Sequence, residues 1–136
     1  MTIVLAVWLA FLELGPIKAE PDVEKRSELA LANADHEIDS ARQAYNAGDL
    51  SAEQTALNEV RDSVELSYDS LEQSHKTPRK SKYYKNAELK VQALLRRLRS
   101  FKDEVDVDHR PAVDAVMNKL QQIHDTLLTE IMSKKH

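Results

Sequence analysis

The stretch Tyr84–Val105, "YKNAELKVQALLRRLRSFKDEV", decides the fold of this 136-residue chain. Its apolar residues recur at steps of three and four, which is the spacing of one face of an α-helix that packs against other helices. They are Tyr84, Ala87, Val91, Leu94, Leu98, Phe101 and Val105, with Leu95 widening the stripe. The pattern predicts a long helix that starts near Thr77 or Ser81, and Thr77-Pro78 fits an N-cap followed by a first-turn proline.

Two further helices are predicted ahead of this one. The first covers about Pro21–Ala47, with the proline in its first turn, and Gly48 ends it by taking the left-handed conformation. The second covers about Ser51–Ser74 and opens with the capping-box pattern Ser51–Gln54. Their apolar stripes are Leu31, Ala34, Ile38, Ala41 and Tyr45 in the first, and Leu57, Val60, Val64, Ser67/Tyr68 and Leu71 in the second.

A fourth helix is predicted to begin around Asp108, the expected N-cap, with Pro111 in its first turn. Its stripe is Val113, Val116, Leu120, Ile123 and Leu127. Short connections between long helices make consecutive helices antiparallel. The chain has only 2 Gly and 4 Pro, and no segment has the pattern of a strand. We therefore expect an all-α, antiparallel up-down-up-down four-helix bundle over residues 20–136.

The first residues form a separate segment. Ile3–Leu12, "IVLAVWLAFL", is a continuous apolar run that is too short to span a bilayer, which needs about 20 residues. It matches the core of a secretory signal peptide, and Ala19 offers a small residue for cleavage. No Lys or Arg precedes the run, which departs from the usual pattern. We expect a signal peptide at 1–19 and a periplasmic or secreted protein; a short apolar helix packed on the domain is the alternative.

Charge is distributed very unevenly along the chain. Residues 20–75 hold 14 acidic and 4 basic side chains, whereas residues 76–102 hold 10 basic side chains and one acid, Glu88. One explanation is internal: antiparallel packing would set Arg96, Arg97 and Arg99 near the carboxylates of adjacent helices. The other is that a basic cap at one end of the bundle contacts anionic polymers or lipid head groups. This basic cap is Arg79, Lys80, Lys82, Tyr83 and Lys85.

The chain lacks the residues that several kinds of site chemistry require. There is no Cys, so thiolate catalysis, disulfides and Cys-ligated metals are excluded. No G-x-S-x-G elbow is present, and Gly15 and Gly48 alone cannot form a glycine-rich phosphate loop. The chain is therefore predicted to be non-enzymatic, with no catalytic residues, no metal site and no cofactor.

Histidines carry the alternative function. Glu72-Gln-Ser-His75 is one instance of the Glu-x-x-His pair that di-iron bundles use twice. His36 and His124 lie beside apolar stripes, where a haem or metal ligand would have to point inward. A small-ligand, metal or haem-binding bundle that uses His36, His75 or His124 thus stays open beside the interpretation that these side chains only border the core.

Two stretches resemble known proteins. Arg42–Leu57, "RQAYNAGDLSAEQTAL", looks like the turn between the paired helices of a tetratricopeptide repeat, although Glu53 stands where that repeat has a small residue. No second copy at the repeat period follows. Lys85–Phe101 and Ile123–Met132 are similar in style to small exported helical-bundle proteins of bacteria that are uncharacterised. That resemblance implies a secreted all-helical domain and no catalytic residues.

Together these observations predict an exported, non-enzymatic interaction protein that contacts anionic partners through the basic cap. A protein or an anionic component of the cell envelope is the expected partner. Nucleic acid is the least favoured one, because the sequence pI is near 5.7 and export removes the protein from the genome.

Overall fold

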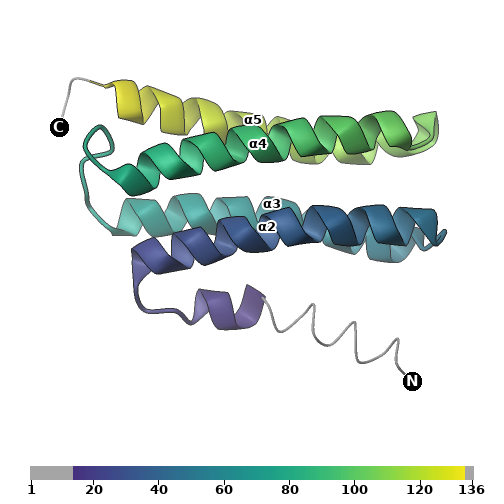
Figure 1. Cartoon of the computed structure of the whole chain (residues 1–136), viewed down its shortest axis with the longest axis horizontal. Coiled ribbons are helices and arrows are strands. Elements are labelled where there is room, and N and C mark those ends of the chain that lie inside the picture. Colours follow the sequence, from purple (N-terminus) through teal and green to yellow (C-terminus); the bar gives the residue numbers. More distant parts are fainter. Residues whose placement is uncertain (1–13, 134–136) are drawn as a thin grey trace.

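Four long helices account for most of the described chain (Figure 1). The structure is a computed structural model, and it describes residues 14–133. The helices are α2 (Val23–Asn46), α3 (Leu50–Gln73), α4 (Lys82–Glu104) and α5 (Arg110–Met132), and a 3-10 turn, η1 (Val107–His109), precedes α5. No strand occurs within these residues, so the predicted all-α class with four long packed helices is confirmed.

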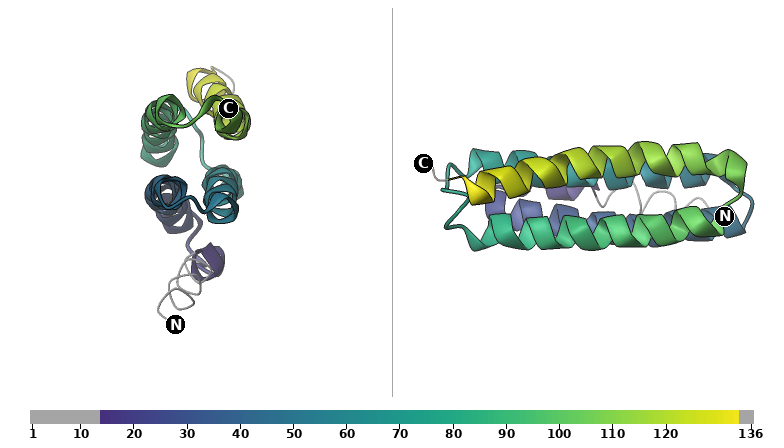
Figure 2. Two further views of the ribbon diagram at one scale, coloured as in Figure 1. Left: turned by 90° about the vertical axis from the view of Figure 1, so that its right-hand side faces the viewer. Right: turned by 90° about the horizontal axis from the view of Figure 1, so that it is seen from above.

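The helices form two stacked hairpins. Consecutive helices run in opposite directions, with α2 and α3 in one layer and α4 and α5 in the other (Figure 1). Seen end-on, α4 lies over α2 and α5 lies over α3, while α3 and α4 sit on a diagonal and touch little (Figure 2). The connection over residues 74–81 therefore crosses one end of the bundle diagonally. Because of this crossing, the spatial neighbours α2 and α4 run parallel.

The predicted signal segment, residues 1–19, lies mostly outside the described residues. Its last part is described: residues 14–18 form a short helical stretch ahead of α2, in which Leu14 and Ile17 are half-buried. Glu20, the first residue after the predicted signal segment, is held by α2, because the guanidinium of Arg26 donates to its backbone oxygen at 3.1 Å. Within residues 14–133, none of the helices has an apolar stretch long enough to cross a membrane.

Two of the predicted helix boundaries are confirmed. Ser81 caps α4, since its hydroxyl accepts from the backbone amides of Tyr83 and Tyr84. Gly48 has φ of 76° just beyond the end of α2, a conformation that costs a side-chain-bearing residue free energy. Thr77-Pro78, the other predicted start of α4, is instead part of the turn that precedes Ser81, where Thr77 accepts backbone hydrogen bonds.

In the first two helices the predicted roles of Pro21 and Ser51 at the helix start are wrong, because a nearby aspartate accepts from the free amides. Pro21 precedes the first helix, which Asp22 caps by accepting from Glu24 and Lys25. The capping box at Ser51 does not form. Asp49 accepts from the Ala52 amide at 3.0 Å, so α3 begins at Leu50 and Ser51 already lies inside the first turn.

The start of α5 also differs from its prediction. Asp108 lies within η1 and is not the N-cap. His109 occupies the N-cap position of α5 and makes no side-chain cap bond. Pro111 does stand in the first turn, as expected, where a missing amide hydrogen leaves no donor unsatisfied.

The core consists of the predicted stripes. Every residue of the α4 stripe is buried, and so is every residue of the α5 stripe. In the first two stripes only Tyr45 and Tyr68 are merely half-buried. The layer between α2 and α3 also contains small and polar side chains: Ser27 and Ser67 share a hydrogen bond of 2.7 Å, and Asn33 donates to Ser63 at 3.0 Å. Small side chains let these two helices approach closely.

Two leucines of α4 test the burial pattern. Leu98 is fully buried, whereas Leu89 on the outer face is 58% exposed. Leu98→Ala is expected to lower the free energy of unfolding by about 2–5 kcal/mol, because it leaves a cavity between the layers. Leu89→Ala, the matched control, is expected to change it by less than about 0.5 kcal/mol. Urea unfolding followed by circular dichroism measures both; equal losses would contradict the assigned face of α4.

Candidate functional site

Helix α4 carries basic side chains on three different faces. Its apolar stripe points into the bundle, so one flank faces α2, the other faces α5, and the remaining side points outward. Each flank is neutralised by carboxylates of the neighbouring helix, and the outward side is not. This division decides which cations are available to a partner.

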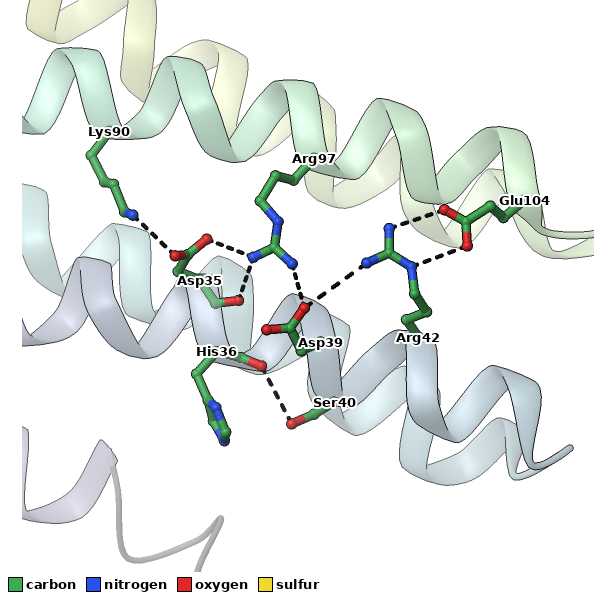
Figure 3. Close-up of polar contacts among 8 residues, drawn as sticks. All are labelled: Asp35, His36, Asp39, Ser40, Arg42, Lys90, Arg97 and Glu104. Carbon is green, nitrogen blue, oxygen red and sulfur yellow. Dashed lines mark hydrogen bonds and ion pairs between the residues drawn. The ribbon is translucent and has the colours of Figure 1, made fainter.

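The flank toward α2 holds a network of ion pairs (Figure 3). Lys90 Nζ lies 3.1 Å from Asp35 Oδ2, and Arg97 Nη1 lies 2.6 Å from Asp35 Oδ1. The same Arg97 nitrogen donates to the Asp35 backbone oxygen at 2.8 Å, and Nη2 donates to Asp39. Arg97 therefore fastens α4 to α2 by side-chain and backbone contacts together, as the internal explanation of the charge requires.

A second contact lies near the far end of the same flank. Arg42 of α2 makes a forked pair with Glu104 of α4, with both N–O distances at 3.0 Å. Its guanidinium also lies 5.7 Å from the centre of the Phe101 ring, within the range of a cation–π contact. The two helices thus exchange charges in both directions, which fixes their register along the axis.

These contacts shift the proton affinities of the network. Burial alone would raise the pKa of Asp35, but the hydrogen bonds and charges of Arg97 and Lys90 outweigh it and hold that pKa below its ordinary value. Burial likewise opposes the charged form of Arg97, yet Asp35 and Asp39 raise its pKa. Asp35 and Arg97 therefore both favour their charged forms.

The flank toward α5 has two contacts of a similar kind. Lys102 Nζ lies 2.7 Å from Asp114 Oδ1. Glu88, the one acid of the basic segment, lies 2.7 Å from Nε2 of His124, which is 8% exposed. His124 is therefore a core-bordering side chain that pairs with a carboxylate, in line with the interpretation that the histidines border the core.

The outward side of α4 is where the structure departs from the internal explanation. Arg96 and Arg99 are exposed and make no ion pair with any residue in the described range 14–133, so the expectation that both lie near carboxylates is wrong. The reason is the rotational setting of the helix. Arg97 turns toward α2, whereas its neighbours one and two positions away project outward.

The basic cap continues this outward side at the start of α4. Its cations Arg79, Lys80, Lys82 and Lys85 are all exposed, and none has an ion pair within the described part of the chain. Tyr83 is half-buried against the core, and Lys82 Nζ lies 5.2 Å from the centre of its ring. The turn is held by the Lys80 and Ser81 amides, which donate to the Thr77 oxygen at 3.0 Å. Arg79 and Lys80 therefore sit on an ordered turn, and Lys82 and Lys85 sit at the start of α4.

The adjacent Lys76 behaves differently. Its Nζ lies 3.1 Å from Glu24 of α2, so this cation is neutralised at the surface. The boundary between paired and unpaired cations thus falls between Lys76 and Arg79.

The histidines proposed as ligands are not gathered into a site. His36 and His75 are exposed, and His75 has a positive φ of 56° in the turn after α3. Glu72 of the Glu-x-x-His pattern accepts from the Tyr84 hydroxyl at 2.8 Å. In residues 14–133, no three His, Asp or Glu side chains are arranged to hold a metal ion. No observation here favours the ligand-binding alternative.

Two polar clusters were not predicted from the sequence. At one bundle end, Tyr68 donates to Glu130 at 2.9 Å, close to the pair of Tyr84 and Glu72. Burial raises the pKa of Tyr68 and Tyr84, and their carboxylate partners raise it further. Burial and the nearby Glu72 charge also raise the pKa of Glu130, although its bond from Tyr68 opposes this. The sequence analysis noted the tyrosines as stripe positions and Glu72 as part of the Glu-x-x-His pattern, but it did not bring them together with Glu130.

The second unpredicted cluster is at the opposite end. Nδ1 of His109 lies 3.3 Å from Oε1 of Glu53, which is 4% exposed. The His109 ring meets Tyr45 edge-on at 5.3 Å, and the Tyr45 hydroxyl accepts from the Asp106 amide. These contacts join the α2–α3 turn to the α4–α5 turn. Glu53 was noticed only as the residue that departs from the repeat-like pattern.

Comparison of the chain with protein-family models, with curated proteins and with solved structures gave no match.

Asp35 gives a pH-dependent test of the paired flank. Asp35→Asn is expected to lower the free energy of unfolding at pH 7 by about 1 kcal/mol, a value reduced for the solvent exposure of these side chains. Because the pKa of Asp35 is lowered by folding, its contribution is complete above the ordinary Asp value of about 3.9 and is lost as the pH falls through the folded value. Urea unfolding of both proteins across acidic and neutral pH measures the difference.

The exposed Asp69→Asn on α3 is the matched control, and it is expected to have little effect at any pH. A loss from Asp35→Asn that stays constant down to acidic pH would contradict an ionised, paired Asp35.

Proposed function

We propose that the protein is a non-enzymatic interaction module, exported from the cytoplasm, whose basic cap contacts an anionic partner. One observation carries the proposal. Lys90, Arg97 and Lys102 are each neutralised by a neighbouring helix, whereas the four cations of the cap have no carboxylate partner in the described chain. The ion pairs between α4 and its neighbouring helices therefore form without the cap cations.

Electrostatics supports this role for the cap. Like charges that are crowded on one turn repel each other, and an anionic partner relieves that repulsion. The turn is ordered by backbone bonds and by the Ser81 cap, so little conformational entropy is lost on binding. Tyr83 adds a flat, half-exposed ring that can cover apolar or sugar surface beside the charges.

The non-enzymatic part of the proposal rests on the residue types. The chain has no Cys and no nucleophile motif, and Glu72, Glu88 and Glu130 are each engaged by a tyrosine or histidine side chain of the bundle. These contacts give each of these carboxylates a structural role in the bundle.

Reversal of charge in the cap tests the proposal. Lys80→Glu combined with Lys82→Glu is expected to weaken retention on immobilised heparin at least tenfold, since each basic group near an anionic surface contributes about 1 kcal/mol. The control is Lys25→Glu with Lys119→Glu, which makes the same change of net charge at lysines outside the cap. Elution salt concentration measures the effect; retention that ignores salt or survives the cap reversal would contradict the proposal.

Export has its own expected outcome. The apolar run Ile3–Leu12 followed by Ala19 supports removal of residues 1–19 in the native host. Mass spectrometry of the protein from that host is expected to find a mature chain that starts at Glu20. An intact N-terminus in the cytosolic fraction would contradict export and would restore nucleic acid as a partner class.

A further inference from the structure

The basic cap is one end of a longer feature. Along α4, the outward positions Lys82, Lys85, Leu89, Gln92, Arg96 and Arg99 follow one another at steps of three and four, so they share one face. All six are exposed. At 1.5 Å of rise per residue, the face extends about 26 Å from Lys82 to Arg99. We call this face, together with Arg79 and Lys80 of the preceding turn, the basic edge.

The carboxylates beside the basic edge on the α2 flank are paired within the bundle: Asp35 and Asp39 both contact Arg97. No carboxylate lies on the edge before Asp103 at its far end. Helix α3 lies on the diagonal across the bundle (Figure 2). It carries Asp62, Glu65 and Asp69 at helical spacing, partly balanced by Arg61 and Lys119, and we call these three residues the acidic edge. Since adjacent helix axes lie about 8–10 Å apart, the diagonal edge is more than about one Debye length away at 0.1 M salt.

The middle of the basic edge carries no charged side chain. Between Lys85 and Arg96 the outward residues are Gln92 and Leu89, and Leu89 is 58% exposed. A flexible soluble polyanion would follow the two groups of cations and would leave this central apolar side chain in water. A flat surface with anionic groups above an apolar layer matches both the cations and the leucine.

We propose that the basic edge docks on a membrane surface that contains anionic lipids, with α4 lying parallel to the membrane plane and Leu89 at the level of the head groups. The inference rests on the proposed function and extends it to one partner and to the whole length of α4. The six cations contact lipid phosphates together because four of them share one face of α4 and the other two lie in the turn directly before it. The acidic edge, across the bundle, faces away from the membrane.

The far end of the edge separates this inference from the proposed function. Arg96→Glu combined with Arg99→Glu leaves the basic cap intact and removes two exposed side chains that hold no ion pair in residues 14–133. Binding to vesicles of phosphatidylcholine and phosphatidylglycerol is expected to fall at least tenfold, at about fivefold for each cation. The control Lys25→Glu with Lys119→Glu is expected to bind these vesicles as the unchanged chain does.

Vesicles of phosphatidylcholine alone report any binding by the apolar residues 3–12, which needs no anionic lipid. Circular dichroism checks that each variant is folded. If the Arg96 and Arg99 reversal binds anionic vesicles as tightly as the unchanged chain while the cap reversal loses binding, the edge is wrong and the cap stands. If the cap reversal also keeps full binding to vesicles and to heparin, the proposed function is wrong as well.

A fluorescent label at Leu89 distinguishes a membrane from other anionic partners. The chain has no Cys, so Leu89→Cys offers a single attachment site for an environment-sensitive dye. With anionic vesicles its emission is expected to rise and shift to the blue, and with heparin it is expected to stay as in water. A dye on Asp69→Cys, on the acidic edge, is the control and is expected to stay unchanged with both. A Leu89 dye that remains in water on vesicle-bound protein would overturn membrane docking and favour a soluble polyanion or an acidic protein.

Discussion

The apolar stripe of α4 is the constraint on which the rest of the structure depends. Tyr84 and Phe101 are its largest buried side chains, and together with the leucines between them they leave α4 one rotational setting in the bundle. That setting decides the direction of every charged residue on the helix. Lys90 and Arg97 turn to α2, Lys102 turns to α5, and Arg96 and Arg99 turn outward. A cation in the stripe itself would be buried without a partner, which is costly.

The same constraint reconciles two interpretations of the basic segment. Neutralisation inside the bundle and attraction of an external partner are compatible, because the proposed partner would contact cations other than those paired between the helices. Pairs such as Lys90 with Asp35 are partly exposed, so their contribution to stability is modest, and their main effect is to specify which helices are neighbours. The outward cations add no such specificity within the described chain, and this leaves them available for a partner.

The sequence predicted the local features of the fold well, because helix periodicity and capping depend on residues a few positions apart. The α4 stripe and the turn at Gly48 were both correct for this reason. The capping prediction failed where two side chains could cap the same helix: Asp49, and not Ser51, caps α3. The diagonal crossing between α3 and α4 was not predictable. A short connection makes consecutive helices antiparallel, but it does not decide which earlier helix the next one packs against. Contacts such as Glu53 with His109 join residues far apart in the chain and have no local pattern.

Cysteine reactivity along α4 tests the rotational setting most directly, because the native chain has no thiol. Single variants Arg96→Cys and Arg99→Cys report the outward side, and the conservative variants Ala87→Cys and Val91→Cys report two stripe positions that are 1% exposed. Under native conditions the first two thiols are predicted to react with a soluble reagent at the rate of an unfolded peptide. The other two are predicted to react slower by orders of magnitude, since only global unfolding exposes them. Fast labelling at positions 87 and 91, or protection at 96 and 99, would contradict this account.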